Sequence, residues 1–292
     1  MNELSASSET YLLDRLRSDD PLVCVELRPP RSGMSYEASM DVWIDMYHSI
    51  QRLVRRDTIV FLTDNAVGQS EEENLGHLTA NLGEDVSLSR IVPFLTCKHP
   101  LEYCQLYAAR AASYGFGALT VLGGDQSVGP PRCVPHSHEL RRVIRDRVPG
   151  LTLGGWVNPH RNPTQQVDFL LQHEAVTDFY MTQVVSYHDM SQIEAFLAEA
   201  RRRGVTQPGV FGVFLYRSAN PKTLKRLADF FPVPVDGVME DFESGMSAEA
   251  VCVKTIAALR EAGAEKVYVS NLGVRRADAQ YRSLVAATSF AR

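Results

Sequence analysis

The 292-residue chain lacks the cysteine patterns of metal-binding and disulfide-rich proteins. Its five cysteines are scattered and include no CxxC pair, so the sequence predicts neither a zinc site nor an iron–sulfur site. Their odd number and irregular spacing are typical of a reducing compartment, and we expect a cytoplasmic protein. The cysteines are Cys24, Cys97, Cys104, Cys133 and Cys252.

Basic excess and long apolar runs are also missing. The formal net charge is -5, which makes electrostatic binding to nucleic acid an unfavoured function. The N-terminus is acidic and polar, unlike a signal peptide, and no apolar run is long enough to span a membrane. We therefore expect a small-molecule partner and neither nucleic acid nor membrane; a homo-oligomer remains open.

What the chain does contain is a regular series of short apolar segments. Hydrophobic residues make up 45% of the sequence and charged residues 22%, as in a globular protein with a full core. Eight segments are rich in β-forming residues and nearly continuous in apolar character, which is typical of strands buried on both faces. They are residues 22–28, 58–64, 90–96, 118–124, 151–157, 178–184, 209–215 and 266–272.

Helical patterns lie between these strands. Three of them end at Gly115, Gly204 and Gly263, the residue type that most often follows a helix. Eight β–α alternations without a composition break predict a single (β/α)8 TIM barrel over residues 1–292, and this length is normal for one such barrel. Residues 1–20 are expected to form an extra N-terminal helix that closes the bottom. A doubly wound open sheet is the alternative.

Polar residues gather where the predicted strands end, which is the face that carries the active site of such barrels. Glu26 is the most informative, because an ionised carboxylate inside an apolar strand is costly unless it is paired or functional. Turn or capping roles are equally reasonable for some of the others. The set is Glu26, Thr63, Asp64, Thr96, Asp125, Asn158, His160, Gln183, Tyr216 and Asn271.

Two loops invite a functional reading that the sequence leaves open. GGDQSVGPP (123–131) lets backbone approach a ligand closely, yet it also reads as a flexible loop with Asp125 as a turn residue. CVPHSH (133–138) lacks partners at metal-ligand spacing and is better explained as a polar loop.

Five motifs in order resemble those of the methylenetetrahydrofolate reductase family, whose fold is a (β/α)8 barrel. They are VELRPPR from 25, FLTCKHP from 94, VLGGDQS from 121, YMTQ from 180 and RADAQY from 276. The resemblance implies reduction of 5,10-methylenetetrahydrofolate to 5-methyltetrahydrofolate by a reduced nicotinamide cofactor.

The resemblance also implies roles for individual residues. Glu26 would be the general acid and Asp125 a contact to the pterin. Thr96, Gln183 and Arg276 would bind the folate substrate. Thr63, Gln183, Asn158, His160 and Tyr216 would contact the nicotinamide cofactor, with Tyr216 standing in for an aromatic residue that the family places after strand seven.

The chemistry of the implied reaction suits these two carboxylates. Protonation of N10 opens the bridging ring to an N5 iminium cation, which accepts hydride. The acid must stay partly protonated near neutral pH, and an apolar setting raises a carboxyl pKa in that direction. A second carboxylate would stabilise the cation that forms. Glu26 suits the first role and Asp125 the second.

Departures from the family pattern concern the flavin. Phe94 replaces a histidine, Gly123 an arginine, and Gln172 a lysine of the family's FAD site, while WVNPHRNP replaces its motif after strand five. Losing a cation and hydrogen-bond partners weakens binding of a pyrophosphate. We therefore expect FAD to be absent, with direct hydride transfer from NADH or NADPH. NADH is preferred, because no arginine can be assigned to a 2′-phosphate.

Two other functions remain open at this point. One is a folate-dependent methyltransferase or demethylase on the same scaffold, which needs no nicotinamide. The other is a non-catalytic folate-binding partner subunit, which the presence of both Glu26 and Asp125 disfavours.

Overall fold

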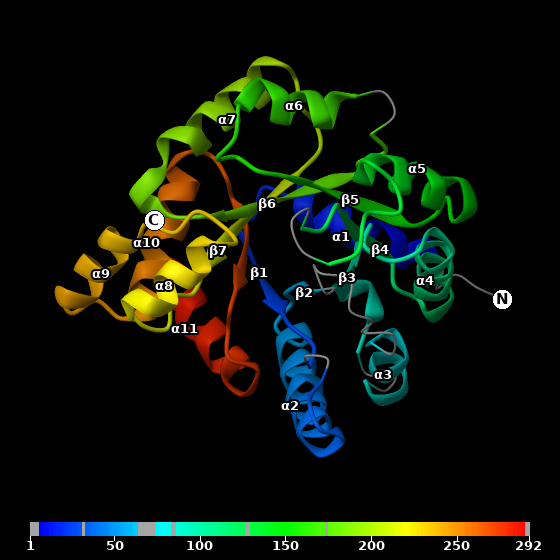
Figure 1. Ribbon diagram of the computed structural model, residues 1–292, viewed down its shortest axis with the longest axis horizontal. Coiled ribbons are helices and arrows are strands. Elements are labelled where there is room, and N and C mark those ends of the chain that lie inside the picture. The colour runs from blue at the N-terminus through cyan, green and yellow to red at the C-terminus, as the bar shows by residue number, and fades with distance from the viewer. Residues whose placement is uncertain are drawn as a thin grey trace.

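A computed structural model describes residues 6–30, 33–63, 74–82, 86–125, 129–172 and 175–289. Eight parallel strands pair in chain order, and β1 also pairs with β8, so the sheet closes into a barrel (Figure 1). This closure confirms the predicted (β/α)8 barrel and excludes the doubly wound sheet. The strands are β1 (Leu22–Leu27), β2 (Val60–Leu62), β3 (Ile91–Thr96), β4 (Ala118–Leu122), β5 (Thr152–Val157), β6 (Phe179–Val185), β7 (Gly209–Phe214) and β8 (Lys266–Ser270).

Helices surround the barrel in Figure 1 and connect its strands. None of the helices in the described ranges is long and apolar enough to cross a membrane. The helices are α1 (Ala6–Arg17), α2 (Tyr36–Val54), α3 (Asn74–Asn81), α4 (Leu101–Tyr114), α5 (Ser137–Arg147), α6 (Pro163–Leu171), α7 (Ser191–Arg202), α8 (Pro221–Ala228), α9 (Val235–Glu243), α10 (Ala248–Glu261) and α11 (Ala277–Ser289), with short 3₁₀ turns η1 (Leu88–Arg90), η2 (Tyr187–Asp189) and η3 (Val274–Arg276).

Helix boundaries follow local capping chemistry. The Oγ of Ser35 accepts a hydrogen bond from the Ala38 backbone N–H at 3.2 Å and so caps the start of α2. At the other end of a helix, Gly115 adopts φ 95° and stops α4, as predicted from its position. β2 is the largest departure, because only three residues of the predicted 58–64 segment form the strand.

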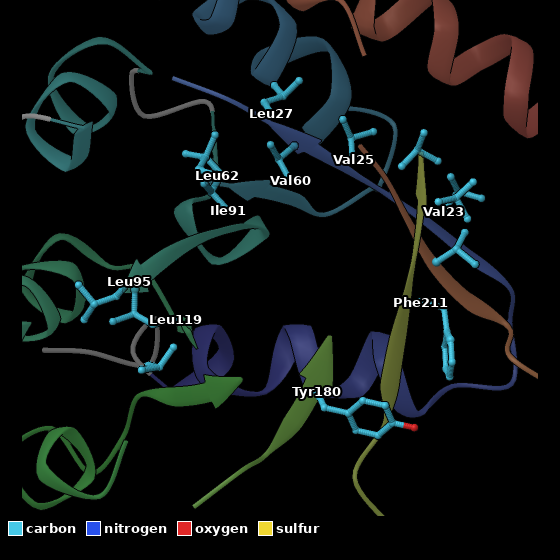
Figure 2. Close-up of a cluster of buried hydrophobic side chains, with 14 of the residues drawn as sticks. Val23, Val25, Leu27, Val60, Leu62, Ile91, Leu95, Leu119, Tyr180 and Phe211 are labelled. Atoms are coloured by element: carbon cyan, nitrogen blue, oxygen red, sulfur yellow. The ribbon is translucent and has the colours of Figure 1, made fainter. Parts of the chain in front are cut away.

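Side chains alternate between two apolar layers along each strand. Val23, Val25 and Leu27 of β1 point outward and pack with the helices, as Figure 2 shows for this cluster. Leu22 and Cys24 belong to the separate cluster that fills the barrel interior. By the same alternation Glu26 faces the interior, at the end of β1 where the barrel opens.

The N-terminal end of the barrel is closed by α1. Leu12 and Leu16 are 2% and 3% exposed and join the interior cluster, which confirms the predicted closing helix. At this end Lys266 is buried, and its Nζ donates to the backbone carbonyls of Ser18 and Asp20. The bottom of the barrel therefore holds a buried cation whose donors are directed at main-chain oxygens.

A second charged group at this end is also well paired. The Asp57 carboxylate lies 2.7 Å from Arg90 and 3.6 Å from Arg15, and accepts a hydrogen bond from the Tyr11 hydroxyl at 2.8 Å. Partial burial raises the pKa of Asp57, but the Tyr11 hydrogen bond and the two arginines outweigh it and lower the pKa overall. The bottom network is thus arranged to keep its carboxylate ionised.

Candidate active site

Glu26 lies at the mouth of the barrel and accepts one side-chain hydrogen bond among the described residues. The Ser270 hydroxyl, on the neighbouring strand β8, donates to Glu26 Oε1 at 2.8 Å. Burial raises the pKa of Glu26 from its ordinary value of 4.5 to about 7, against the smaller lowering effects of Ser270 and Arg28. A carboxyl group with this pKa holds its proton in about half of the molecules at neutral pH, as a general acid requires.

Aromatic rings form an apolar floor beneath Glu26. Phe61, which pairs with Glu26 in the strand register, lies 6.0 Å from the ring of Phe94 and 6.1 Å from that of Tyr268. The Tyr268 hydroxyl donates to the Thr182 carbonyl at 2.7 Å, so its proton is directed away from the carboxylate. This floor explains the desolvation of Glu26, because it offers the carboxylate no further donor.

Thr63 and Gln183 also lie at this end. Thr63 follows Phe61 by two residues and so faces the interior. Its buried Oγ1 has no hydrogen-bond partner among the described residues, as expected for a group that meets a ligand. Gln183 is partly buried, and its Oε1 accepts from the Val184 backbone N–H at 2.9 Å. Thr96 is fully buried at the end of β3.

Asp125 follows β4 at the same end of the barrel, after two glycines. Gly124 adopts φ 74°, a left-handed conformation that turns the chain there. The guanidinium of Arg132 lies over Gly123, 2.7 Å from where a Cβ would be, and donates to the Gly124 carbonyl at 2.6 Å. A cation therefore does lie beside position 123. The family motif gives no sign of this cation, because Arg132 lies nine residues after Gly123 in the sequence.

The remaining predicted residues lie around the strand ends in local structure. Asn158 Oδ1 accepts from the His160 backbone N–H at 3.1 Å, and His160 Nε2 lies 2.9 Å from the Val184 carbonyl. Arg276 is exposed in η3. These contacts tie the β5 and β6 ends together; they bear on loop structure and do not test nicotinamide binding. Asp64 lies outside the described residues.

Tyr216 lies in an apolar cluster outside the barrel mouth. It is 4% exposed and packs with Leu224, Val238 and Val251, while its ring lies 5.0 Å from that of Phe214. A ring held in this way favours a structural role over stacking on a nicotinamide. Phe214, in contrast, ends β7 and is only partly buried.

Ser270 and Trp156 are two mouth residues that sequence reasoning passed over. Strand alternation identifies both, because Ser270 is two residues after the inward-facing Tyr268 and Trp156 packs against the interior cluster. A serine at the end of an apolar strand and a tryptophan within one carry no motif of their own. Only the closing of β8 against β1 brings Ser270 to Glu26.

The same residues bear on whether a flavin or a metal could bind here. Phe94 is 4% exposed and packs in the aromatic floor, so it offers an FAD neither a hydrogen bond nor a charge. Arg132 supplies a cation, but its two terminal nitrogens face the carbonyls of Gly124 and Pro135. Among the described residues, Phe94 and Arg132 do not form the polar cradle of a flavin pyrophosphate. Within the described ranges, no cluster of histidine, cysteine or carboxylate residues has the geometry of a metal site.

Comparison with known proteins identifies the fold. No protein-family model and no curated protein matches the chain. An uncharacterized protein from Clostridium thermocellum, described as binding two copies of 5-methyl-5,6,7,8-tetrahydrofolic acid, has a similar structure with a TM-score of 0.64. The similarity covers 99% of each chain at 14% sequence identity. The likeness supports the barrel along the full chain, while the identity is too low to transfer a function.

Proposed function

We propose that this protein binds a reduced folate at the barrel mouth and reduces 5,10-methylenetetrahydrofolate to 5-methyltetrahydrofolate. The observation that carries the proposal is Glu26, a carboxyl group whose pKa is raised to about 7 by burial at the catalytic face of a (β/α)8 barrel. The 5-methyltetrahydrofolate bound by the similar Clostridium protein supports a folate as ligand.

In the proposed mechanism the protein's residues donate one proton and stabilise one positive charge. Protonated Glu26 gives its proton to N10, the N10–CH₂ bond breaks, and an N5 iminium cation forms. The Asp125 carboxylate stabilises this cation as it develops. A reduced nicotinamide bound beside the folate would supply the hydride that the iminium carbon accepts, leaving 5-methyltetrahydrofolate and the oxidised nicotinamide. Glu26 regains its proton from solvent.

Direct hydride transfer without flavin is part of the proposal. Phe94 takes a position at which a flavin site needs a polar side chain, and the aromatic floor that it forms suits a planar ring better than a pyrophosphate. The nicotinamide ring would lie near the folate in van der Waals contact, so that positioning supplies much of the rate enhancement. NADH is the proposed donor, with NADPH as the alternative.

One experiment separates the proposal from its rivals. Purified protein is mixed with methylenetetrahydrofolate and NADH, and NADH absorbance is followed with and without added FAD. We expect NADH oxidation by a colourless protein, with 5-methyltetrahydrofolate as product and no response to FAD. Folate binding without NADH oxidation would favour the methyltransferase or the non-catalytic subunit, and a yellow preparation with stoichiometric FAD would overturn the flavin-independent route.

A further inference from the structure

Arg132 occupies an unusual place beside the loop that carries Asp125. Its guanidinium carbon and Nη2 both lie 2.7 Å from the position of a Cβ on Gly123, and Nη2 donates to the Gly124 carbonyl at 2.6 Å. A side chain larger than hydrogen at position 123 would therefore displace the guanidinium from this place. The contact depends on both residues at once.

The segment that carries Arg132 is itself anchored to the end of β3. The Cys133 backbone N–H donates to the Cys97 carbonyl at 2.7 Å, and the buried Lys98 Nζ donates to the Pro130 carbonyl at 2.8 Å. Arg132 thus reaches the Gly123–Gly124 backbone from a fixed base on the neighbouring strand.

The two glycines make such an anchor necessary. Glycine has no side chain that could pack against the barrel, and it adopts many backbone conformations at little cost. Gly124 adopts one of these, in the left-handed region. Without an outside contact the backbone before Asp125 would sample several conformations. Arg132 restricts it by a charge-assisted hydrogen bond, which is stronger than a neutral one.

We propose that Arg132 is a positioning residue that holds the Asp125 carboxylate in its productive place for the reaction proposed above, on which this inference rests. Arg132 contacts the backbone and not the folate. Gly123 is required because it leaves room for the guanidinium.

The test is a double-variant cycle between the two residues. Arg132→Ala removes the guanidinium, and we expect hydride transfer in single-turnover NADH oxidation to fall roughly 10²-fold, the size of a small misplacement of a reacting group. Gly123→Ala should act similarly, because the new methyl group displaces the guanidinium. In the Arg132→Ala background, Gly123→Ala should change the rate less than twofold, a rough limit for uncoupled neutral changes.

Controls separate positioning from loss of structure. The guanidinium is the mobile end of a long side chain, so Gly123→Ala should leave the urea unfolding midpoint nearly unchanged while the rate falls. Arg132→Lys keeps one donor for the Gly124 carbonyl and should restore part of the rate. Arg147→Ala, an exposed arginine at the end of α5, should have no effect.

Two results would overturn the proposal. One is a multiplicative cycle, in which Gly123→Ala costs as much with Arg132 absent as with it present. The other is a fall in stability without a fall in hydride transfer. If the wild type oxidises no NADH, the proposed reaction fails separately, and the same cycle is then measured on the dissociation constant of 5-methyltetrahydrofolate, where lack of coupling would refute the role of Arg132.

Discussion

The two ends of the barrel differ in how completely their charged groups are paired. At the bottom, Lys266 of β8 directs its ammonium group at two backbone carbonyls, and the nearby Asp57 is surrounded by two arginines and a tyrosine hydroxyl. At the mouth, Glu26 of the adjacent strand β1 has one serine hydroxyl and an aromatic floor. The two charged groups lie on neighbouring strands of the same sheet.

The difference teaches how to separate a structural charge from a reactive one. At the bottom, the Tyr11 hydrogen bond and two arginines lower the pKa of the exposed Asp57 and its charge is kept, while burial lowers the pKa of Lys266. At the mouth, burial outweighs one hydrogen bond and a more distant arginine, so the pKa of Glu26 is raised to about 7. An incompletely satisfied carboxyl group, at the end where such barrels carry their active sites, has the properties that the proposed proton donor needs.

The strongest way to break this comparison is to neutralise each charge in turn. Glu26→Gln keeps the size of the side chain and removes the proton, so turnover should fall ~10²–10⁴-fold, the usual contribution of a positioned acid. Lys266→Met keeps the length and loses the donors to two carbonyls, so it should lower stability by about 1–3 kcal/mol and leave kcat unchanged. Steady-state NADH oxidation and urea unfolding of both variants measure this.

The comparison would fail if the effects were exchanged. A Glu26→Gln variant that is fully active but unstable would make Glu26 a structural residue. A Lys266→Met variant that folds normally but is inactive would indicate that the bottom of the barrel takes part in the reaction.

Asp125→Asn should give the next largest effect. The amide still accepts a hydrogen bond but carries no charge, so hydride transfer should fall by roughly 10²-fold while folate binding changes less, as for a group that acts on charge formed in the transition state. In the proposed mechanism the cation exists only after Glu26 has given up its proton. The double variant should therefore be little slower than Glu26→Gln alone, because residues that act as a unit are not additive.

Single-turnover rates of the wild type, both single variants and the double variant test this order of events. Fully multiplicative losses would contradict the sequential mechanism. They would assign Asp125 an independent role, such as holding its own loop.

The third prediction concerns the free energy of unfolding. Most substitutions of a buried residue lower it, but Glu26→Gln should raise it at alkaline pH. The folded state binds the Glu26 proton more tightly than the unfolded chain, whose carboxyl has an ordinary pKa of 4.5 against about 7 when folded. Stability is therefore lost as pH rises through this window, by up to about 3 kcal/mol above pH ~7. Gln carries no such penalty. Urea unfolding at pH 5 and pH 8 should show an advantage of Glu26→Gln that grows with pH; an advantage independent of pH would refute the shift.

The architecture could be predicted from the sequence because its signals are local. Nearly continuous apolar strands and glycines after helices, such as Gly115, determine the eight β–α units, and Leu12 and Leu16 close the bottom as the expected N-terminal helix. β2 was predicted too long because apolar content alone does not show which residues find a partner strand. That pairing depends on neighbours distant in the sequence.

The site could be predicted only in part, for the same physical reason. Glu26 was recognisable as a carboxylate in an apolar strand, but its partner Ser270 lies 244 residues away and meets it only because the barrel closes. Arg132 was missed because a motif is read at fixed positions, whereas a long side chain can reach across a loop to Gly123. Burial of Tyr216 follows from the packing of α8, α9 and α10 around it, which no strand motif encodes.

The smallest expected effect is that of Ser270 on the pKa of Glu26 at the barrel mouth. The Ser270 hydroxyl stabilises the ionised form of Glu26, and so lowers a pKa that burial has raised. Ser270→Ala should raise that pKa further, and the alkaline limb of the kcat/KM–pH profile should move upward by roughly 0.5–1 pH unit, the equivalent of a hydrogen bond of about 1 kcal/mol. Ser270→Thr retains the hydroxyl and is the matched control, with a limb close to that of the wild type. A downward shift in Ser270→Ala would mean that the hydroxyl supports the protonated acid, and an unchanged limb in Ser270→Ala would mean that Glu26 is not the group whose ionisation limits the reaction.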